Sequence, residues 1–442
     1  MSAIPINESA LDRFVLDFRE RHQVPGLAIA ISRQGDVIYQ KGFGVRDMQT
    51  KEPVTPDTMF GVASVTKSFT AVAIMQLAFE GQLSLDDPVT RYLPSFRLPK
   101  AGDPHEVKIR HLLSHTTGLP PIVRREELTK WDEHFEHIAA ADCELLGAPG
   151  EFFSYCNDTF LLLGAIIERV TGRLFRRYVT HLLLEPLQMN RSTFSLEELA
   201  RMHNVSVPYV KQAGASEPKR ADWPTLGNYE VGGGIRSNVL DLLKYGELHV
   251  NSGRIRDVSI ASEALLKEMR QPVHRLTRNA WYGYAFKVVP EYVPGTTLVE
   301  HGGGQPGVSS NFGFVPEAGL VVAVLSNLDQ VPIRDLWLAA VNAGLGLPLE
   351  HREEREPSLE ASPQELQRLV GTYRSAEGGY VRIFLREGEP VADVAGTQFA
   401  MRPSAVDTLV FRETEQPLRF FFKSEERAWA VLLGLRMLTR VD

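Results

Sequence analysis

The sequence lacks the features that mark disulfide-rich, membrane-spanning and secreted proteins. Its 442 residues include 2 cysteines, Cys143 and Cys156, which are too few for a disulfide scaffold or a structural zinc site. No stretch reaches the roughly 18 apolar residues of a membrane span. The N-terminus carries neither the basic region nor the apolar run of a secretory signal. We therefore expect a cytoplasmic protein, or a periplasmic or secreted one if a leader was removed.

An excess of positive charge is also missing. The chain has 48 Lys+Arg against 55 Asp+Glu, a formal net charge of -7, and so lacks the basic surface that nucleic-acid binding usually requires. We expect neither a nucleic-acid nor a membrane partner. The 43% hydrophobic and 23% charged residues are typical of globular proteins, and the length favours two or three domains.

Hydrophobic periodicity predicts an α/β region in the first 346 residues. Apolar residues at helical spacing and alternating apolar runs mark its elements. The predicted helices are 8–22, 64–80, 238–250 and 332–344, and the predicted strands are 27–32, 37–42, 282–289, 297–301, 309–315 and 319–326. Helical segments dominate residues 80–200, which predicts a helical insertion, and 205–225 is a polar surface excursion.

A second, smaller region follows. Residues 347–364 are charged and contain proline, as linkers do. Short alternating runs then recur in a pattern typical of a small antiparallel β domain, at 380–386, 391–395, 408–412, 418–423 and 428–432. We therefore expect a catalytic domain at 1–346, a linker at 347–364 and a β-barrel-like domain at 365–442.

The strongest candidate for chemistry is the Ser-x-x-Lys pair of Ser64 and Lys67, at the start of a predicted helix. Positions i and i+3 of a helix share a face, so the Lys67 amine can reach the Ser64 hydroxyl and act as the base that a serine nucleophile requires. The helix N-terminus favours a developing oxyanion. A structural role for Ser64 as helix N-cap stays open. The other such pair, Ser216 and Lys219, lies in the polar excursion with no helix behind it.

A second motif is Tyr155-Cys156-Asn157, the one Tyr-x-Asn of the sequence, just before an apolar helix. Residues i and i+2 of an extended segment project to the same side. A tyrosine beside a lysine ammonium can relay the serine proton, and an asparagine amide can orient substrate and lysine. Cys156 is then a candidate site for inhibition by alkylation. The alternative is Tyr155 as a core residue and Asn157 or Ser154 as a helix cap.

The third motif is His301-Gly302-Gly303-Gly304, at the end of a predicted strand. Glycines on a strand edge let a substrate backbone approach closely, and the Gly304 N–H is a candidate oxyanion donor. His301 can hold a substrate carboxylate or assist proton transfer. A glycine-rich turn with an incidental histidine is the alternative.

The three motifs in this order resemble the penicillin-recognising serine hydrolases: class C β-lactamases, D-alanyl-D-alanine carboxypeptidases, D-aminopeptidases and related esterases. The flanks at 111–119, 149–155 and 232–237 are also similar to that family. The resemblance covers roughly residues 10–345. It implies an α/β (α+β) β-lactamase/transpeptidase-like fold, with an antiparallel sheet flanked by helices and a helical insertion.

The resemblance also implies a mechanism without a cofactor. Ser64 would attack an amide, ester or β-lactam carbonyl, with Lys67 and Tyr155 sharing the proton work, and water would release the acyl group. The oxyanion would lie between the N–H groups of Ser64 and Gly304. Asn157, His301 and Gly303 would line the substrate site, which serves a small molecule or a short peptide.

Two departures from class C β-lactamases bear on the substrate. His301 stands where those enzymes usually have lysine, which favours the peptidase and esterase branches. The C-terminal β domain is foreign to β-lactamases, whereas a similar barrel borders the active site in some D-amino-acid-specific peptidases. We therefore expect a peptidase with D-amino-acid preference and read the barrel as a substrate gate or an oligomerisation module. A carboxylesterase, a β-lactamase, a non-catalytic penicillin-binding sensor and a homo-oligomer stay open.

Other motifs in the sequence are incomplete. His111 and His115 are four residues apart, and His134 and His137 three apart, but neither pair has the glutamate of a His-Glu-x-x-His zinc site. The glycine run after His301 resembles a lipase oxyanion loop, yet no Gly-x-Ser-x-Gly elbow follows it. No helix follows that run to bind a dinucleotide pyrophosphate either. We expect no metal and no nucleotide cofactor.

Overall fold

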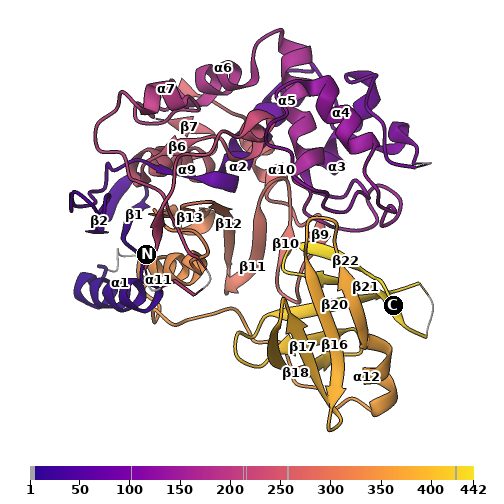
Figure 1. Cartoon of the computed structure of the whole chain (residues 1–442). Helices are drawn as coiled ribbons and strands as arrows, with labels where there is room; N and C mark the ends of the chain where they lie inside the picture. Colours follow the sequence, from indigo (N-terminus) through magenta and orange to yellow (C-terminus); the bar gives the residue numbers. More distant parts are fainter. Residues whose placement is uncertain (1–4, 101, 213, 216, 256–257, 424–425) are drawn as a thin grey trace. The chain divides into compact units, whose positions relative to one another are not determined.

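The computed structural model describes residues 5–442 except 101, 213, 216, 256–257 and 424–425, and these residues form two compact units (Figure 1). The first unit comprises Met1–Ser84, Leu163–Val273 and Tyr282–Arg352. The second comprises Leu85–Leu162, His274–Trp281 and Glu353–Asp442. The domain boundaries expected from the sequence stay a prediction.

An antiparallel sheet forms the centre of the first unit, in the order β2-β1-β14-β13-β12-β11. Its strands are β1 (Gly26–Arg33), β2 (Asp36–Gly44), β11 (Lys287–Val293), β12 (Thr296–Gln305), β13 (Val308–Val315) and β14 (Leu320–Ser326). Every residue of β13 and β14 is buried, because helices cover both faces of the sheet (Figure 1). The predicted strands are confirmed except 282–289, where a Gly283–Phe286 turn separates β10 (Trp281–Tyr282) from β11.

The helices that cover this sheet are close to those predicted. They are α1 (Glu8–His22), α2 (Thr66–Phe79), α9 (Val239–Val250) and α11 (Ile333–Leu345). Asn238 caps α9 by accepting a hydrogen bond from the Asp241 N–H, as N-cap residues do. The α2 helix begins later than predicted, because Ala63–Val65 form the 3-10 turn η1.

Shorter elements complete the first unit. The helices are α6 (Phe175–Val179), α7 (Leu196–Leu199), α8 (Glu230–Gly233) and α10 (Glu263–Met269), with the π turn η4 (Thr180–Leu184) and the 3-10 turns η5 (Gly227–Tyr229) and η6 (Pro316–Ala318). The strands are β3 (Phe60–Gly61), β4 (Tyr209–Val210), β5 (Lys219–Arg220), β6 (Arg236–Ser237), β7 (Arg254–Ile255) and β8 (Val258–Ser259).

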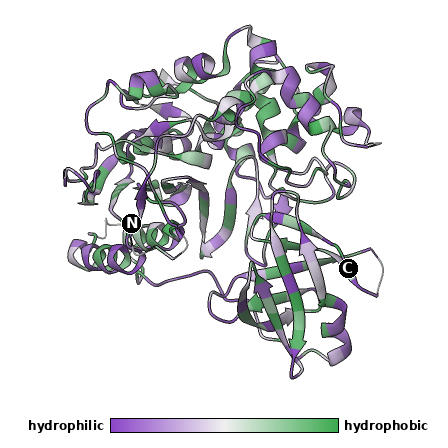
Figure 2. Cartoon of the chain, in the orientation of Figure 1, coloured by the Kyte–Doolittle hydropathy of each residue, from purple (hydrophilic) through white to green (hydrophobic). Residues whose placement is uncertain are grey.

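The second unit contains a closed antiparallel barrel of strands β15 to β22. Its elements are α12 (Pro363–Leu369), β15 (Gly371–Arg374), β16 (Tyr380–Arg386), β17 (Glu389–Val394), β18 (Thr397–Ala405), β19 (Thr408–Phe411), β20 (Pro417–Phe422), β21 (Ala428–Leu433) and β22 (Arg436–Arg440). Hydrophobic and hydrophilic residues mix along these strands (Figure 2), and the inward side chains form a core around Tyr373, Met401 and Phe420. The expected β domain is therefore a barrel.

The rest of the second unit supplies short helices and one smaller core. The helices are α3 (Ile109–Leu113), α4 (Trp131–Ala139) and the first turns of α5 (Asn157–Thr171), with the 3-10 turns η2 (Val89–Arg91) and η3 (Pro104–Glu106) and the strand β9 (His274–Arg275). Leu146 packs with Ala430 and Met437 of the barrel. This core joins the segment before α5 to the β21–β22 hairpin. In the described part of the chain, no helix is both long and apolar enough to span a bilayer.

Candidate active site

Ser64 lies in the strained turn η1, between β3 and α2. The residue before it, Ala63, has φ +46°, a left-handed conformation that a non-glycine residue adopts at a cost of about 1–3 kcal/mol. Hydrogen bonds hold the turn in place, since the Val62 N–H donates to the Ile235 carbonyl and the Ser310 hydroxyl donates to the Val62 carbonyl at 2.8 Å. Ser64 itself is half-buried.

Lys67 is buried with its amine directed at this turn. Its side chain is 1% exposed, and the Nζ atom lies 3.5 Å from the Ser64 Oγ. The same amine donates to the Gly232 carbonyl oxygen at 3.1 Å, so α8 fixes its position. Sequence reasoning placed Lys67 beside Ser64, as the structure does, but missed the Gly232 carbonyl.

The glycines of β12 lie against the Ser64 turn. A Cβ on Gly303 would overlap the Ser310 Oγ and the Val62 carbonyl oxygen, so only glycine fits there. A Cβ on Gly304 would meet nothing within 4 Å, so this residue borders open space. The structure therefore brings Gly303 to the turn that carries Ser64, with Gly304 next to it on the strand.

His301 is a buried, neutral member of the same strand. Burial, and then the charge of Lys67, lower the pKa of His301 to about 4. The Nδ1–H donates to the Gly302 carbonyl at 2.6 Å, and Nε2 then accepts from the Tyr282 hydroxyl at 3.1 Å. A neutral imidazole offers no charge to a substrate carboxylate. Tyr282 was not predicted, since nothing in its local pattern links it to His301.

The structure brings Ser64, Lys67 and the β12 residues together in the first unit, whereas Tyr155 and Asn157 belong to the second unit. Tyr155 is 3% exposed, and Asn157 begins α5. The ring of Tyr155 stacks on that of His115, with centroids 4.0 Å apart, and the Arg436 guanidinium lies 4.6 Å from its centroid. Neither neighbour was predicted as a site residue.

Cys156, between them, is unsuited to alkylation. The residue is fully buried, and burial followed by the charge of Asp158 raises the pKa of its thiol to about 12. Since only a thiolate reacts readily with an alkylating agent, the structure contradicts the expected reactivity of Cys156.

The histidines considered for a metal site have other roles. His111 accepts from the Lys108 N–H through Nδ1 at 3.1 Å, and His115 stacks on Tyr155. The imidazole of His134 lies 3.3 Å from the Asp158 carboxylate. In the alternative Ser-x-x-Lys pair, Ser216 lies outside the described residues and Lys219 is exposed on β5.

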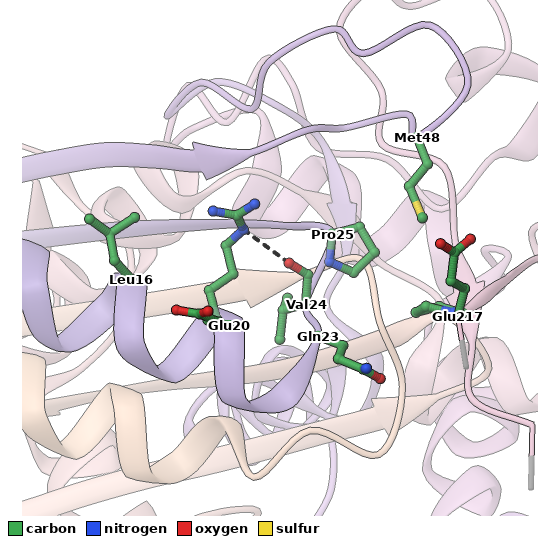
Figure 3. Close-up of a pocket in the computed structure, with 9 residues that line it drawn as sticks. Leu16, Glu20, Gln23, Val24, Pro25, Met48 and Glu217 are labelled. Carbon is green, nitrogen blue, oxygen red and sulfur yellow. Dashed lines mark hydrogen bonds between the residues drawn. The ribbon is translucent and has the colours of Figure 1, made fainter. Parts of the chain in front are cut away.

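A pocket of about 560 Å³ lies at the C-terminal end of α1 (Figure 3). Two of the residues that line the pocket are joined by a hydrogen bond, which the Arg19 guanidinium donates to the Val24 carbonyl at 3.0 Å. The described lining residues are Leu16, Arg19, Glu20, Gln23, Val24, Pro25, Met48, Glu217 and Pro218. None of the predicted site residues is among them, so we assign this pocket no part in the chemistry.

The sequence matches a known protein family over the part of the chain that carries the sheet and the serine–lysine pair. The family model described as Beta-lactamase matches residues 11–344, about three quarters of the chain. The chain belongs to the Beta-lactamase family, and it has the β-lactamase/transpeptidase-like fold with an added barrel.

Individual relatives extend the comparison. Protein flp of Staphylococcus aureus (strain MW2) is 32% identical over 229 residues, 50% of this chain and 46% of that protein, so this chain matches about half of the relative's length. Penicillin-binding protein 4 of Amycolatopsis lactamdurans is 30% identical over 385 residues, 82% of this chain and 96% of that protein.

Several solved structures match nearly the whole chain, including the following two. One is the octameric penicillin-binding protein homologue from Pyrococcus abyssi, with 28% identity, TM-score 0.73 and coverage of 98% of this chain and 100% of that one. The other is SurE with D-Leu, with 23% identity, TM-score 0.73 and coverage of 98% and 99%, a likeness of fold. Both matches include the C-terminal barrel.

Proposed function

We propose that this protein is a serine hydrolase that forms an acyl-enzyme on Ser64 and cleaves small peptides, amides or esters. The observation that carries the proposal is the buried Lys67 amine, 3.5 Å from the Ser64 Oγ and held by the Gly232 carbonyl. A buried amine beside a serine hydroxyl is the arrangement that removes the serine proton. The strained Ala63 backbone fixes the direction of the nucleophile.

In the proposed acylation, the Ser64 Oγ forms a bond to the substrate carbonyl carbon while its proton passes to Lys67 or Tyr155. The carbonyl oxygen becomes an oxyanion between the N–H groups of Ser64 and Gly304, a contribution of about 2.7–4 kcal/mol per donor. The leaving group then takes the proton as its bond to the acyl carbon breaks. Water hydrolyses the ester and restores Ser64.

Tyr155 and Asn157 take part in the same reaction in this proposal. Their order in the chain and the family membership support this arrangement. The phenol would share the proton transfer, and the Asn157 amide would orient the substrate.

A neutral His301 bears on the substrate. Because its pKa is lowered to about 4, His301 carries no charge near pH 7 and favours uncharged acyl groups over a substrate carboxylate at this position. We further propose a peptidase with D-amino-acid preference. The C-terminal barrel supports this, since the matched structure of SurE, which has that barrel, holds D-Leu.

A hydrolysis panel tests these proposals. It comprises D- and L-aminoacyl p-nitroanilides, p-nitrophenyl esters and nitrocefin, each with the wild type and Ser64→Ala. We expect turnover of D-aminoacyl substrates above their L-isomers and none by Ser64→Ala. Turnover of esters alone would make the protein a carboxylesterase, and turnover of nitrocefin alone a β-lactamase. A fluorescent penicillin that labels Ser64 and is never released would identify a sensor.

The proton-transfer roles need separate variants. Lys67→Ala and Tyr155→Phe should slow acylation by orders of magnitude while thermal melting stays near that of the wild type. Normal acylation in either variant would remove that residue from the proton transfer. The octameric state of the Pyrococcus abyssi homologue supports the further proposal of a homo-oligomer, which light scattering of the full chain measures directly.

A further inference from the structure

Two side chains of the second unit pack against the Tyr155 ring. The His115 imidazole stacks on the ring at 4.0 Å between centroids and 30° between planes. The Arg436 guanidinium carbon lies over the ring, 4.6 Å from its centroid. The Tyr155 ring is therefore in contact with a stacked imidazole and with a cation.

His115 is built to hold this position. Its φ of +54° is left-handed, a conformation that few non-glycine residues adopt. Its carbonyl accepts from the Ser154 N–H at 3.0 Å, and its Nδ1 accepts from the Cys156 N–H at 3.3 Å. An accepting Nδ1 requires the neutral imidazole with its proton on Nε2. His115 thus fixes the main chain on both sides of Tyr155.

Arg436 comes from the barrel, and backbone hydrogen bonds fix its place. It begins β22 at the tight β21–β22 turn. The Tyr155 N–H donates to the Leu435 carbonyl at 2.8 Å, and the Met437 N–H donates to the Ser154 hydroxyl oxygen at 3.1 Å. These two bonds, from the residues on either side of Arg436, attach the hairpin to the tyrosine segment.

One carboxylate balances the charge of Arg436. Its Nε donates to Glu377 Oε2 at 3.0 Å, and the two side chains are 31% and 29% exposed. Further titratable groups on the segments around Tyr155 include the buried thiol of Cys156, His274 against Phe153, Glu151 and the pair of His134 on α4 with Asp158 on α5. Arg436 thus places a cation against the phenol, with Glu377 as its counter-ion.

We propose that Arg436 and His115 are positioning residues for proton transfer by Tyr155, His115 by fixing the ring and Arg436 by stabilising the phenolate. This inference rests on the proposed function, in which the Ser64 proton reaches the phenolate oxygen and then passes to the leaving group. A cation over an aromatic ring attracts a phenolate more strongly than a neutral phenol. The barrel therefore contributes to the proton transfer itself.

The test is the acylation rate constant as a function of pH, measured by stopped-flow burst with a neutral p-nitrophenyl ester. A neutral ester removes any direct contact between Arg436 and a substrate carboxylate from the result. Arg436→Met should raise the pH of half-maximal acylation by about half a pH unit. Below that pH, acylation should then be about threefold slower than in the wild type. Arg436→Lys should restore most of the shift.

Glu377→Gln is a matched variant that should move the pH of half-maximal acylation in the opposite direction. Removing the counter-ion leaves the charge of Arg436 less neutralised, so half-maximal acylation should move to lower pH. Because the pair is partly exposed, salt should shrink both shifts. A steric role for Arg436 alone would not produce opposite shifts from the two partners.

His115→Asn tests the stacked histidine. Asparagine tolerates the left-handed backbone and keeps an acceptor oxygen, but it removes the stacked ring. We expect slower acylation at every pH, whereas His111→Asn in the preceding helix α3 should acylate as the wild type does. If Tyr155→Phe acylates slowly but the pH profiles of acylation in Arg436→Met and Glu377→Gln match that of the wild type, this inference is overturned and the proposed function is not. Normal acylation by Tyr155→Phe would overturn both it and the proposed proton relay.

Discussion

The Nζ amine of Lys67 donates a hydrogen bond to the carbonyl oxygen of Gly232 at 3.1 Å. The amine also fills the space that a side chain at position 232 would occupy. A Cβ at position 232 would lie 2.7 Å from Nζ. Gly232→Ala must therefore displace the amine from Ser64. Since a displacement of about 1 Å can cost about 100-fold in rate, we expect acylation to fall by about that factor with KM little changed.

The neighbouring glycine is the matched control. A Cβ on Gly233 would lie 3.6 Å from the Gln305 Oε1, an ordinary contact. Gly233→Ala should therefore acylate at nearly the wild-type rate in the same stopped-flow measurement. Equal rates for the two alanine variants would show that Gly232 does not position Lys67.

Local patterns account for much of what the sequence predicted. Ser64 and Lys67 are three residues apart at a helix start, so their meeting depends on helical geometry alone, and the structure has it. The strands of the first unit are continuous apolar runs, and four of their six predicted ranges match to within two residues at each end. The one strand broken in the structure contains Gly283, whose turn has no signal in the apolar pattern.

Contacts between distant segments could not be predicted in this way. Tyr282 meets His301 across 19 residues, and Arg436 meets Tyr155 across 281. Three barrel strands were not predicted. The strands β15 and β22 are short, and β18 carries a proline and exposed polar residues. The helix α12 begins inside the predicted linker, where a Ser362–Glu365 capping box starts it. Sequence spacing thus predicts the reacting groups better than the groups that position them.

Alanine substitutions at Gly303 and Gly304 of β12 should have different effects on the free energy of unfolding. Gly303→Ala would press a Cβ against the Val62 carbonyl and the Ser310 hydroxyl, which a rigid strand cannot relieve. We expect the free energy of unfolding in urea to fall by about 2 kcal/mol. Gly304→Ala, with no atom within 4 Å of its Cβ, should unfold at the wild-type midpoint. Equal midpoints would mean that β12 is not seated against the Ser64 turn.

Cys156 should resist alkylation in the folded protein. Its thiol is buried, and its pKa is raised to about 12, so about one molecule in ten thousand carries a thiolate at pH 8. Iodoacetamide should modify the half-buried Cys143 first, and should reach Cys156 only after unfolding in urea. Peptide mass spectrometry locates the label, with Cys143→Ser as the control. Rapid labelling of Cys156 in that variant would contradict its burial.

Acid should destabilise the protein through a histidine that is not one of the candidate site residues. His249 is buried against Phe314, at 4.7 Å between ring centroids, with Phe286 and Tyr245 around it. Burial, then the charge of Arg270, lower the pKa of His249 to about 3. Among the described residues, neither ring nitrogen has a hydrogen-bond partner. Folding therefore requires the neutral imidazole.

Between pH 6.5 and about 3, the unfolded chain binds a proton at His249 that the folded chain does not. The free energy of unfolding must therefore fall as the pH is lowered through this window, by about 2 kcal/mol at pH 5 from this residue. His249→Phe should remove that part of the loss while keeping the aromatic packing. Urea midpoints at pH 7 and pH 5 measure the difference, with the exposed His181→Gln as control. The prediction fails if His249→Phe loses as much stability between the two pH values as the wild type does.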